Sequence, residues 1–203
     1  AEADPGRFAQ IDEGERESAI DELKEEIDYI AGIARNLLSL SGGERSGREE
    51  TDLDEVISST LSLLRHSARE RGICIRFERA ADVLRLPVNR NEIKQVILNL
   101  VKNSFDAMTS GGEIRIVTSR IELEARRIAR IEFADDGPGI QAARIEDVFL
   151  PFYSTRKGKG DSVGLGLSIC YGIVEQHGGK ISVRNLEAGG CAFTVDLPME
   201  AAA

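Results

Sequence analysis

Asn99-Leu-Val-Lys-Asn103-Ser-Phe-Asp106 is the stretch that decides the fold, together with Asp135-Asp-Gly-Pro-Gly139 and Gly164-Leu-Gly166-Leu-Ser168, which follow it in the chain. The first segment predicts a helix with asparagines on one face, and the second predicts an acidic turn rich in glycine. The third predicts a helix that opens with glycines. Each segment is a weak signal alone, but their order and spacing favour one shared ligand site.

The first segment places Asn99, Asn103 and Asp106 at positions i, i+4 and i+7, so they share one face of the predicted helix. The opposite face is apolar and points to a core, with Ile93, Ile97, Leu100, Val101 and Phe105. Side-chain amide oxygens suit a Mg²⁺ ion that keeps water and phosphate oxygens in its shell. A plain solvated face is the alternative. Lys102 could equally contact a phosphate or lie at the surface.

The second segment puts Asp135 at the end of a predicted strand and glycines directly after it. Gly137 and Gly139 would let a ligand approach the backbone closely. A carboxylate accepts hydrogen bonds from amino groups, and the adenine N6 group is one such donor. A tight turn, in which Asp and Gly serve only the turn geometry, is the alternative.

The third segment, Gly164 to Ser168, opens a helix whose free N–H groups and positive end favour phosphate. It matches neither a Walker A loop nor a GxGxxG fingerprint. The stretch before it, residues 149–160, combines three aromatic residues (Phe149, Phe152 and Tyr153) with a basic, glycine-rich tail. We predict that this stretch anchors a lid over a nucleotide, with phosphate contacts from Thr155, Arg156 and Lys157. A solvated loop is the alternative for these charges.

The composition narrows the class of protein. The 203 residues are 41% hydrophobic and 30% charged, with a formal net charge of -9, which argues against direct nucleic-acid binding. The three cysteines, Cys74, Cys170 and Cys191, are predicted to be small buried hydrophobic residues in a reducing compartment. No apolar run approaches the roughly 18 residues that a membrane span requires.

Periodicity predicts a mixed α/β domain over residues 51–200, with a sheet covered by about three helices. The predicted helices run from Asp52 to Gly72, from Asn89 or Asn91 to Gly111-Gly112, and from Gly164 to His177. The inner, core-facing side of the first helix is expected to consist of Val56, Thr60, Leu63, Leu64 and Ala68. The predicted strands cover residues 73–77, 83–86, 113–119, 127–133, 180–184 and 191–197.

Upstream of that domain, residues 1–18 are predicted to be loop or disordered, and residues 42–50 a linker rich in Gly, Ser and charge. Residues 19–41 carry apolar side chains at heptad spacing, which favours a bundle helix over an ordinary amphipathic helix. The chain begins without Met, so we expect it to be cut from a longer protein in which a membrane anchor could precede it.

With these motifs in place, residues 51–198 resemble the catalytic and ATP-binding part of sensor histidine kinases, within the gyrase, chaperone and histidine kinase ATPase superfamily. Asn99 to Asp106 matches the N box of that family and Asp135 to Gly139 its G1 box. Phe149 to Phe152 matches the F box, and Gly164 to Leu167 the G2 box. The overall sequence pattern most resembles that of nitrogen-regulation kinases.

The resemblance implies a two-layer α/β sandwich of the Bergerat type, preceded by a helical segment. It implies that Asn103, helped by Asn99, holds Mg²⁺ and that Asp135 accepts from adenine. It assigns further nucleotide contacts to Lys102, Asp106, Gly137, Gly139, Ile140, Gly164, Leu165, Gly166 and Leu167. Residues 19–41 resemble the second helix of the family's dimerisation and phosphoacceptor hairpin.

The resemblance also implies an activity, the transfer of the ATP γ-phosphate to a histidine on a dimerisation helix, of the same or a partner subunit, for relay to a response regulator aspartate. Gyrase-like ATPases carry a glutamate at the position of Asn99, and an amide there cannot act as a general base, which disfavours hydrolysis. His66 and His177 are both predicted to be structural, so the chain alone is expected to bind ATP without phosphorylating itself.

Further expectations from the resemblance are a homodimer when the hairpin is complete and a cytoplasmic location, free or as the cytoplasmic part of a membrane-bound sensor. Three alternatives stay open: an ATP-hydrolysing switch, a serine kinase acting on a regulator, and a dimerisation module with a degenerate pocket.

Overall fold

The structure is a computed structural model, and it describes residues 47–109, 111–123, 125–153 and 164–200. The predictions for residues 1–18 and 19–41 therefore lie outside the described residues, as do those for most of the linker. The described elements, in chain order, are β1 (Glu49–Asp52), α2 (Leu53–Glu70), β2 (Ile73–Glu78), β3 (Arg85–Val88), α3 (Arg90–Ala107), β4 (Gly112–Leu123), β5 (Arg126–Asp135), the 3-10 turns η1 (Ala142–Arg144) and η2 (Asp147–Phe149), α4 (Gly166–Gln176), β6 (Lys180–Asn185) and β7 (Cys191–Pro198).

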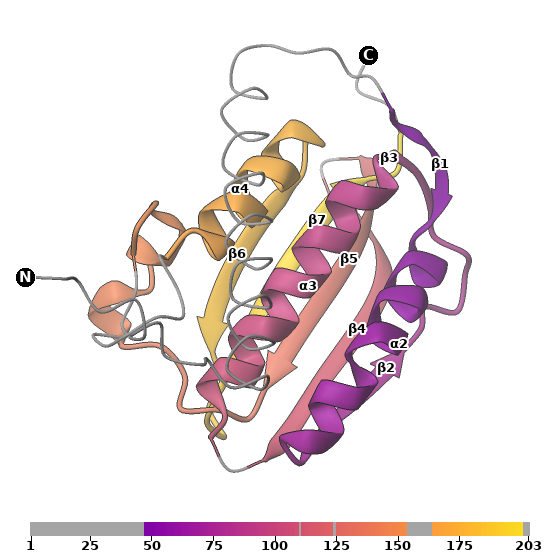
Figure 1. The fold of residues 1–203 in the computed structure, drawn as a ribbon. Helices are drawn as coiled ribbons and strands as arrows, with labels where there is room; N and C mark the ends of the chain where they lie inside the picture. The colour runs from indigo at the N-terminus through magenta and orange to yellow at the C-terminus, as the bar shows by residue number, and fades with distance from the viewer. Residues whose placement is uncertain (1–46, 110, 124, 154–163, 201–203) are drawn as a thin grey trace, which may run out of the picture. The chain divides into compact units, whose positions relative to one another are not determined.

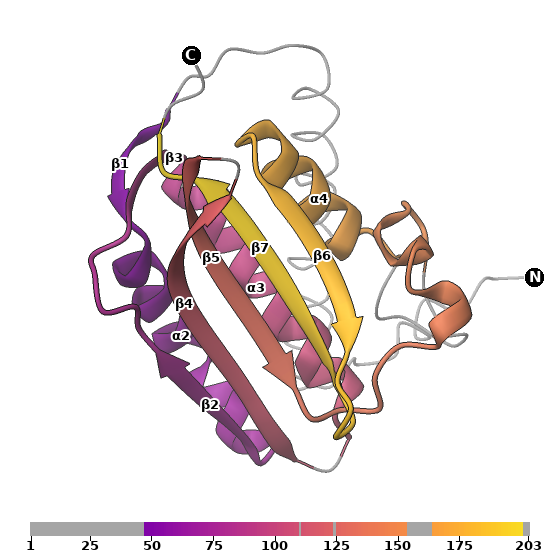
Figure 2. The same ribbon diagram turned by 180° about the vertical axis from the view of Figure 1, so that it is seen from behind.

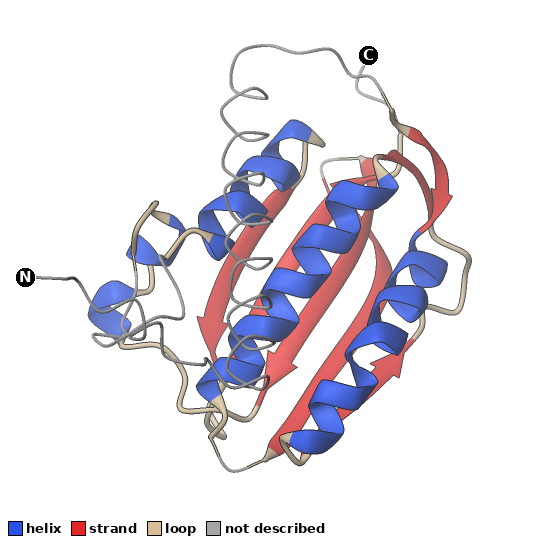
Figure 3. Cartoon of the chain, viewed as in Figure 1, coloured by secondary structure: helices blue, strands red, loops and turns tan. Residues whose placement is uncertain are grey.

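The main sheet has five strands in the order β2-β4-β5-β7-β6, and only the β2–β4 pair is parallel. Helices α2, α3 and α4 lie over one face of this sheet (Figures 1 and 3). Seen from behind, the other face carries no helix of the described chain (Figure 2). The predicted two-layer α/β sandwich with a mixed sheet and three helices is therefore confirmed.

The helix boundaries follow from capping chemistry. Asp52 accepts the backbone N–H of Glu55 at 3.2 Å and begins α2, while Gly72, at φ +65°, follows its end. Asn89, and not Asn91, begins α3, because its side-chain oxygen accepts the N–H groups of Asn91 and Glu92. The predicted start of α2 is confirmed.

The core lies between the three helices and the inner face of the sheet. The largest fully buried side chains include Leu53, Ile57, Ile93, Ile97, Leu100, Ile114, Ile116, Ile131 and Phe133. Alternate residues of β4 are buried, as the predicted alternation requires. Each such aliphatic or aromatic side chain contributes about 1.5–3 kcal/mol by leaving water.

The outer face of the sheet is covered by cross-strand ion pairs instead of helices. Arg130 on β5 binds its register partner Asp196 on β7 through two bonds of 2.7 Å. Further pairs join Arg76 to Glu113 at 2.9 Å and Arg184 to Glu132 at 3.1 Å. Two of these pairs join neighbouring strands, and the third joins β6 to β5 across β7. Opposite charges arranged in this way suit a solvated face, so this side of the sheet needs no second layer of helices.

Two features of the elements differ from the sequence predictions. Leu63 is 71% exposed and does not belong to the inner face of α2, where Leu61 is buried instead. The predicted strands near residues 73–77 and 83–86 both form, but they lie in different sheets. β2 pairs with β4, whereas β3 pairs with a strand that the sequence did not predict, β1, whose first residues fall in the predicted linker.

His177 is a structural link between α4 and α3. Its Nδ1 donates to the Ile173 carbonyl at 2.8 Å, and its Nε2 accepts the backbone N–H of Asn89 at 3.1 Å. Burial lowers the pKa of this imidazole below its usual value. The ring is therefore neutral in the fold, and it has the structural role that the sequence analysis predicts for it. Arg48 supplies the cation at this end, because its guanidinium donates to the Gln176 carbonyl.

We predict that acid destabilises the domain through His177. The unfolded chain binds a proton at this residue near pH 6.5 and the folded chain only at lower pH, so the free energy of unfolding falls as the pH drops below that value. The loss is at most about 1.4 kcal/mol per pH unit.

Denaturant titrations between about pH 7.5 and pH 5.5 should show a smaller loss in His177→Gln than in the parent. His66→Gln, which changes an exposed histidine beside Glu70, should behave as the parent does. Equal losses in parent and His177→Gln would contradict this role.

Candidate functional site

The asparagine face of α3 lies against the start of α4. The Asn99 side-chain amide donates to the Gly166 carbonyl at 3.2 Å. A Cβ atom on Gly166 would lie 4.0 Å from Asn103 Oδ1, so both amides border the glycines that open the helix. The first and third sequence motifs, more than sixty residues apart in the chain, therefore meet.

The side-chain nitrogen of Asn103 lacks a hydrogen-bond acceptor. Its Nδ2 is buried and has no hydrogen-bond partner among the described residues. A buried donor of this kind costs roughly 1–3 kcal/mol unless an acceptor is supplied, and the oxygen of a polar ligand would supply one. Of the other predicted residues on this helix, Lys102 is exposed, and Asp106 is half-buried with Arg71 at 3.8 Å.

Cys170 lies behind Asn99 on the neighbouring helix. Its thiol is fully buried and lies 3.8 Å from the Val96 carbonyl of α3. Burial raises the pKa of Cys170 to about 12, while a hydrogen bond with the Asn99 side chain acts in the opposite direction. The thiol is thus a neutral packing group that supports Asn99, as the sequence predicted for this cysteine.

Asp135 is the buried acid of the site, with 4% of its surface exposed. Its Oδ2 accepts from the Ser104 hydroxyl at 3.0 Å and from the Cys191 thiol at 3.4 Å. Its Oδ1 accepts from the Gly137 N–H at 3.1 Å. An ionised carboxyl has about four acceptor directions, so one direction stays available to a ligand.

The two glycines of the turn after Asp135 have no room for a side chain. A Cβ atom on Gly137 would lie 2.9 Å from Asp135 Oδ1, and Gly139 has a φ of +73°. Asn185 at the end of β6 fixes the turn, because it accepts the Ile140 N–H at 2.8 Å and donates to the Ile140 carbonyl at 2.6 Å. The backbone at this position is thereby held close to the buried carboxylate.

The aromatic segment before the third motif is only partly an anchor. Phe149 packs on Tyr171 and Phe193, with ring centroids 6.0 and 6.4 Å apart. Phe152, by contrast, is 72% exposed and has a left-handed φ of +64°, so the expectation that it anchors the segment was wrong. Gly164, at φ +72°, lies against the backbone of Phe152 and Tyr153, which leaves no room for a Cβ.

Some predicted site residues lie outside the described residues, and some contacts were not predicted. Thr155, Arg156 and Lys157 are among the former. Ser104, Cys191 and Asn185 hold the site together and were missed as site residues. Cys74 is exposed, so the expectation that it is buried was wrong.

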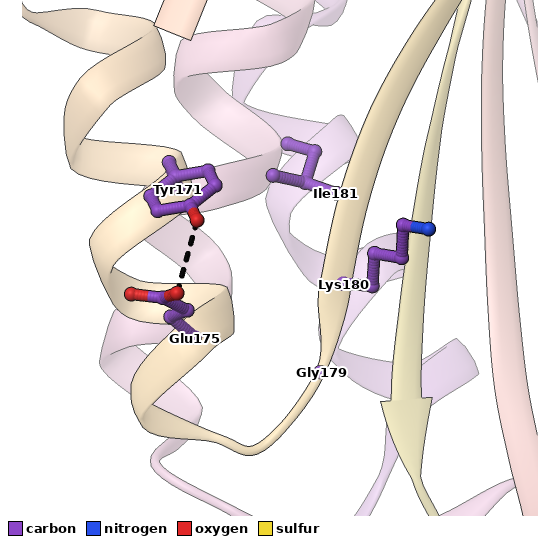
Figure 4. A pocket seen from close by; sticks show the side chains of 5 residues that line it. All are labelled: Tyr171, Glu175, Gly179, Lys180 and Ile181. Carbon is purple, nitrogen blue, oxygen red and sulfur yellow. Dashed lines mark hydrogen bonds between the residues drawn. The ribbon is translucent and has the colours of Figure 1, made fainter. Parts of the chain in front are cut away.

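A separate cavity of about 220 Å³ lies between the C-terminal half of α4 and the start of β6 (Figure 4). It is lined by Tyr171, Glu175, Gly179, Lys180 and Ile181, and the Tyr171 hydroxyl donates to Glu175 at 2.9 Å. Glu175 is nine residues beyond Gly166, about 14 Å along the helix. This cavity therefore differs from the site that the motifs form.

The described part of the chain contains no group of three or more His, Cys, Asp or Glu residues that could hold a metal ion. A divalent cation at the motif site would instead depend on the amide oxygens of Asn99 and Asn103, completed by ligand oxygens and water. None of the described helices is long and apolar enough to cross a bilayer.

Comparison with known proteins identifies this arrangement as a nucleotide-binding domain of a known class. Residues 88–201, more than half of the chain, match the family model of histidine kinase-, DNA gyrase B- and HSP90-like ATPases. The chain belongs to this family. All three ligand-site motifs lie within the matched residues.

The chain is similar to several sensor kinases. It is 31% identical to the sensor histidine kinase ZraS of Escherichia coli strain K12 over 186 residues, which cover 92% of this chain and 38% of ZraS. It is 32% identical to the sensor protein TdiS of Thauera aromatica, over 85% of this chain and 31% of that protein. The chain thus spans about two fifths or less of the length of these relatives.

Solved structures support the same class. The catalytic domain of the histidine kinase ThkA superposes with a TM-score of 0.66 at 32% identity, covering 75% of this chain and 97% of that domain. ThkA in complex with the response regulator protein TrrA gives a TM-score of 0.68 at 30% identity, over 98% of this chain and 53% of that one.

We predict that Gly190 is indispensable to the site although it belongs to no ligand motif. A Cβ there would overlap the Asp135 carbonyl, and the residue has a φ of +83°. Gly190→Ala should lower the free energy of unfolding by more than about 3 kcal/mol, with a matching fall in Tm.

Gly189→Ala is the matched control, because Gly189 has a φ of +100° but no atom within 4 Å of an added Cβ. Gly189→Ala should lower the free energy of unfolding by only about 1 kcal/mol, which is the strain of a left-handed backbone conformation. Equal thermal unfolding of the two variants would contradict the tight contact with Asp135.

Proposed function

We propose that this chain is the ATP-binding catalytic part of a sensor histidine kinase, which transfers the ATP γ-phosphate to a histidine. The observation that carries the proposal is that α3 joins three groups of atoms. It bears the Asn99 and Asn103 amides, it contacts Gly166 at the start of α4 through Asn99, and it contacts the buried carboxylate of Asp135 through Ser104. The amides suit the metal ion, the glycines suit the phosphates, and the carboxylate suits the base of one nucleotide.

At the base, the remaining acceptor direction of Asp135 would receive the N6 amino group of adenine. The narrow turn at Gly137, Gly139 and Ile140 would allow the base to lie against the backbone. At the other end, the start of α4 at Gly164, Leu165, Gly166 and Leu167 would face the phosphates, where free N–H groups favour negative charge. Lys102 and Asp106 border the same face of α3.

Mg²⁺ fits the amides on this face, and we propose Asn103 as its principal ligand with help from Asn99. When bound there, the ion would supply positive charge that offsets the negative charge developing on the phosphates during transfer. The Asn99 Nδ2 is occupied by the Gly166 carbonyl, which leaves its oxygen available. Thr155, Arg156 and Lys157 are proposed as further phosphate contacts.

An amide at position 99 also favours transfer over hydrolysis. A side-chain amide cannot remove a proton from water, so residue 99 orients groups and does not act as a general base. Catalysis would then consist of holding the triphosphate in line with the acceptor and neutralising its charge.

The acceptor histidine is proposed to lie on a dimerisation helix of the complete protein, in the same or the partner subunit. His177 is buried and holds two backbone groups, and His66 is exposed but lies on α2 beside Glu70 at 3.3 Å. His177 is therefore not suited to receive phosphate, and we propose that His66 is not the acceptor either. Residues 19–41 are proposed as one helix of that homodimeric hairpin, joined to this domain by a linker.

The phosphate would pass onward to the receiver domain of a response regulator. ThkA, which is 30% identical to this chain, has been solved in complex with its response regulator TrrA. We propose the same kind of partner here, and a cytoplasmic location for the domain. An ATP-hydrolysing switch is the second candidate, because the matched family includes gyrase-like and HSP90-like ATPases.

The two candidates differ in where the phosphate goes. With γ-labelled ATP, Mg²⁺ and a separately supplied dimerisation hairpin that carries its histidine, we expect the label to appear on the hairpin and little free phosphate to accumulate. A hairpin with that histidine changed to Gln is the control. Steady phosphate release at the same rate with or without the hairpin would favour hydrolysis instead.

The metal assignment predicts a specific defect. Asn103→Ala should weaken ATP binding about ten- to hundredfold when Mg²⁺ is present, because both an amide ligand and a buried donor are lost. In EDTA the variant and the parent should differ much less. Leu63→Ala, a change on the exposed face of α2, is the control and should alter neither value. An equal defect with and without Mg²⁺ would contradict the metal role.

A further inference from the structure

The back of the Asp135 carboxylate is closed by side chains from two different elements. Ser104 projects from α3, and Cys191 is the register partner of Asp135 on the neighbouring strand β7. Their hydroxyl and thiol lie 3.0 and 3.4 Å from the same oxygen, Oδ2. Both acceptor directions of Oδ2 are therefore occupied from inside the domain.

Both groups are able to donate to Asp135. The Ser104 hydroxyl also lies 3.3 Å from the Leu100 carbonyl, but its single hydrogen favours the shorter bond to the charged carboxylate. Burial and the neighbouring Asp135 raise the pKa of the Cys191 thiol to about 12. The thiol thus keeps its hydrogen at neutral pH and stays a donor rather than a reactive thiolate.

The other oxygen faces the opposite way. Oδ1 accepts one hydrogen bond, from the Gly137 N–H at 3.1 Å, and keeps one direction for a ligand. If Oδ2 lost its donors, the carboxylate could rotate or take up water, and its orientation toward the ligand would no longer be fixed. Because the one remaining acceptor direction of Oδ1 has a fixed orientation, a base binds tightly only if it presents a hydrogen-bond donor at that point.

We propose that Ser104 and Cys191 are positioning residues that determine base specificity, by holding Asp135 so that only a purine with an exocyclic 6-amino group is bound tightly. This inference rests on the proposed function, because it assumes that the site binds a purine nucleotide. It assigns a role to a cysteine that the sequence alone indicates only as a buried hydrophobic residue.

The test compares ATP with inosine triphosphate, which has an oxygen in place of the 6-amino group. The affinities of the parent, Cys191→Ala and Cys191→Ser are measured by competition against a fluorescent nucleotide, together with a thermal melt of each variant. Cys191→Ala should lose about three- to tenfold in ATP affinity, the value of one hydrogen bond, with inosine triphosphate unchanged. Cys191→Ser, which restores a donor, should recover the preference for ATP.

Two further variants complete the test. Ser104→Ala should behave as Cys191→Ala does. Cys170→Ala removes the other buried thiol, which faces α3 and not Asp135, and should leave the ratio of the two affinities as in the parent. If Cys191 only fills space, its loss should weaken both nucleotides together, and serine should not rescue the ratio.

The outcomes separate this inference from the proposed function. A parent that prefers ATP, with an unchanged ratio in Cys191→Ala and Ser104→Ala, overturns the inference and leaves the proposed function intact. A parent that binds neither nucleotide overturns both. A parent that prefers ATP, with a reduced ratio that Cys191→Ser restores, supports both.

Discussion

The buried carboxylate of Asp135 is the constraint on which the site depends. A charge with 4% exposure is costly unless its oxygens are paired, and the domain pairs them with groups from α3, β7 and the glycine turn. These bonds fix the distance between helix and sheet at the point where the turn begins. Gly190 belongs to the same constraint, because only a residue without a Cβ fits against the Asp135 carbonyl.

Helix α4 is held at both ends, and this joins the two chemical halves of the site. Its first turn binds Asn99 through the Gly166 carbonyl. Its last turn binds Arg48 through the Gln176 carbonyl, and His177, directly after it, binds the N-terminal cap of α3. Both ends of α4 therefore contact α3, at the middle of α3 and at its N-terminal cap, so the amides and the glycines that open α4 keep one relative position.

Much of this organisation could be predicted from the sequence, because it depends on local patterns. The spacing of Asn99 and Asn103 defines a helix face without any knowledge of the fold, and a glycine-flanked Asp135 after a strand indicates a ligand turn. Alternation in β4 and β5 predicts strands, although both extend beyond the predicted bounds. Even the exposure of Cys74 follows from its place between buried Ile73 and half-buried Ile75 on a strand of period two.

The remaining features depend on contacts between distant residues, which local patterns do not contain. Ser104, Cys191 and Asn185 reach their partners across 31, 56 and 45 residues. Serine, cysteine and asparagine have many ordinary uses, so no motif marks them. The pairing of β1 with β3 also had no signal, since two four-residue strands offer too short a pattern.

The most direct measurement is a calorimetric titration of ATP with Mg²⁺ into the chain and into Asp135→Asn. We expect binding by the parent and a loss of at least about tenfold in the variant, because a buried amide cannot replace a carboxylate that accepts from three donors and would also accept from the base. Equal binding by the two proteins would remove Asp135 from the site. No binding by the parent would contradict the central claim that these motifs form a working nucleotide site.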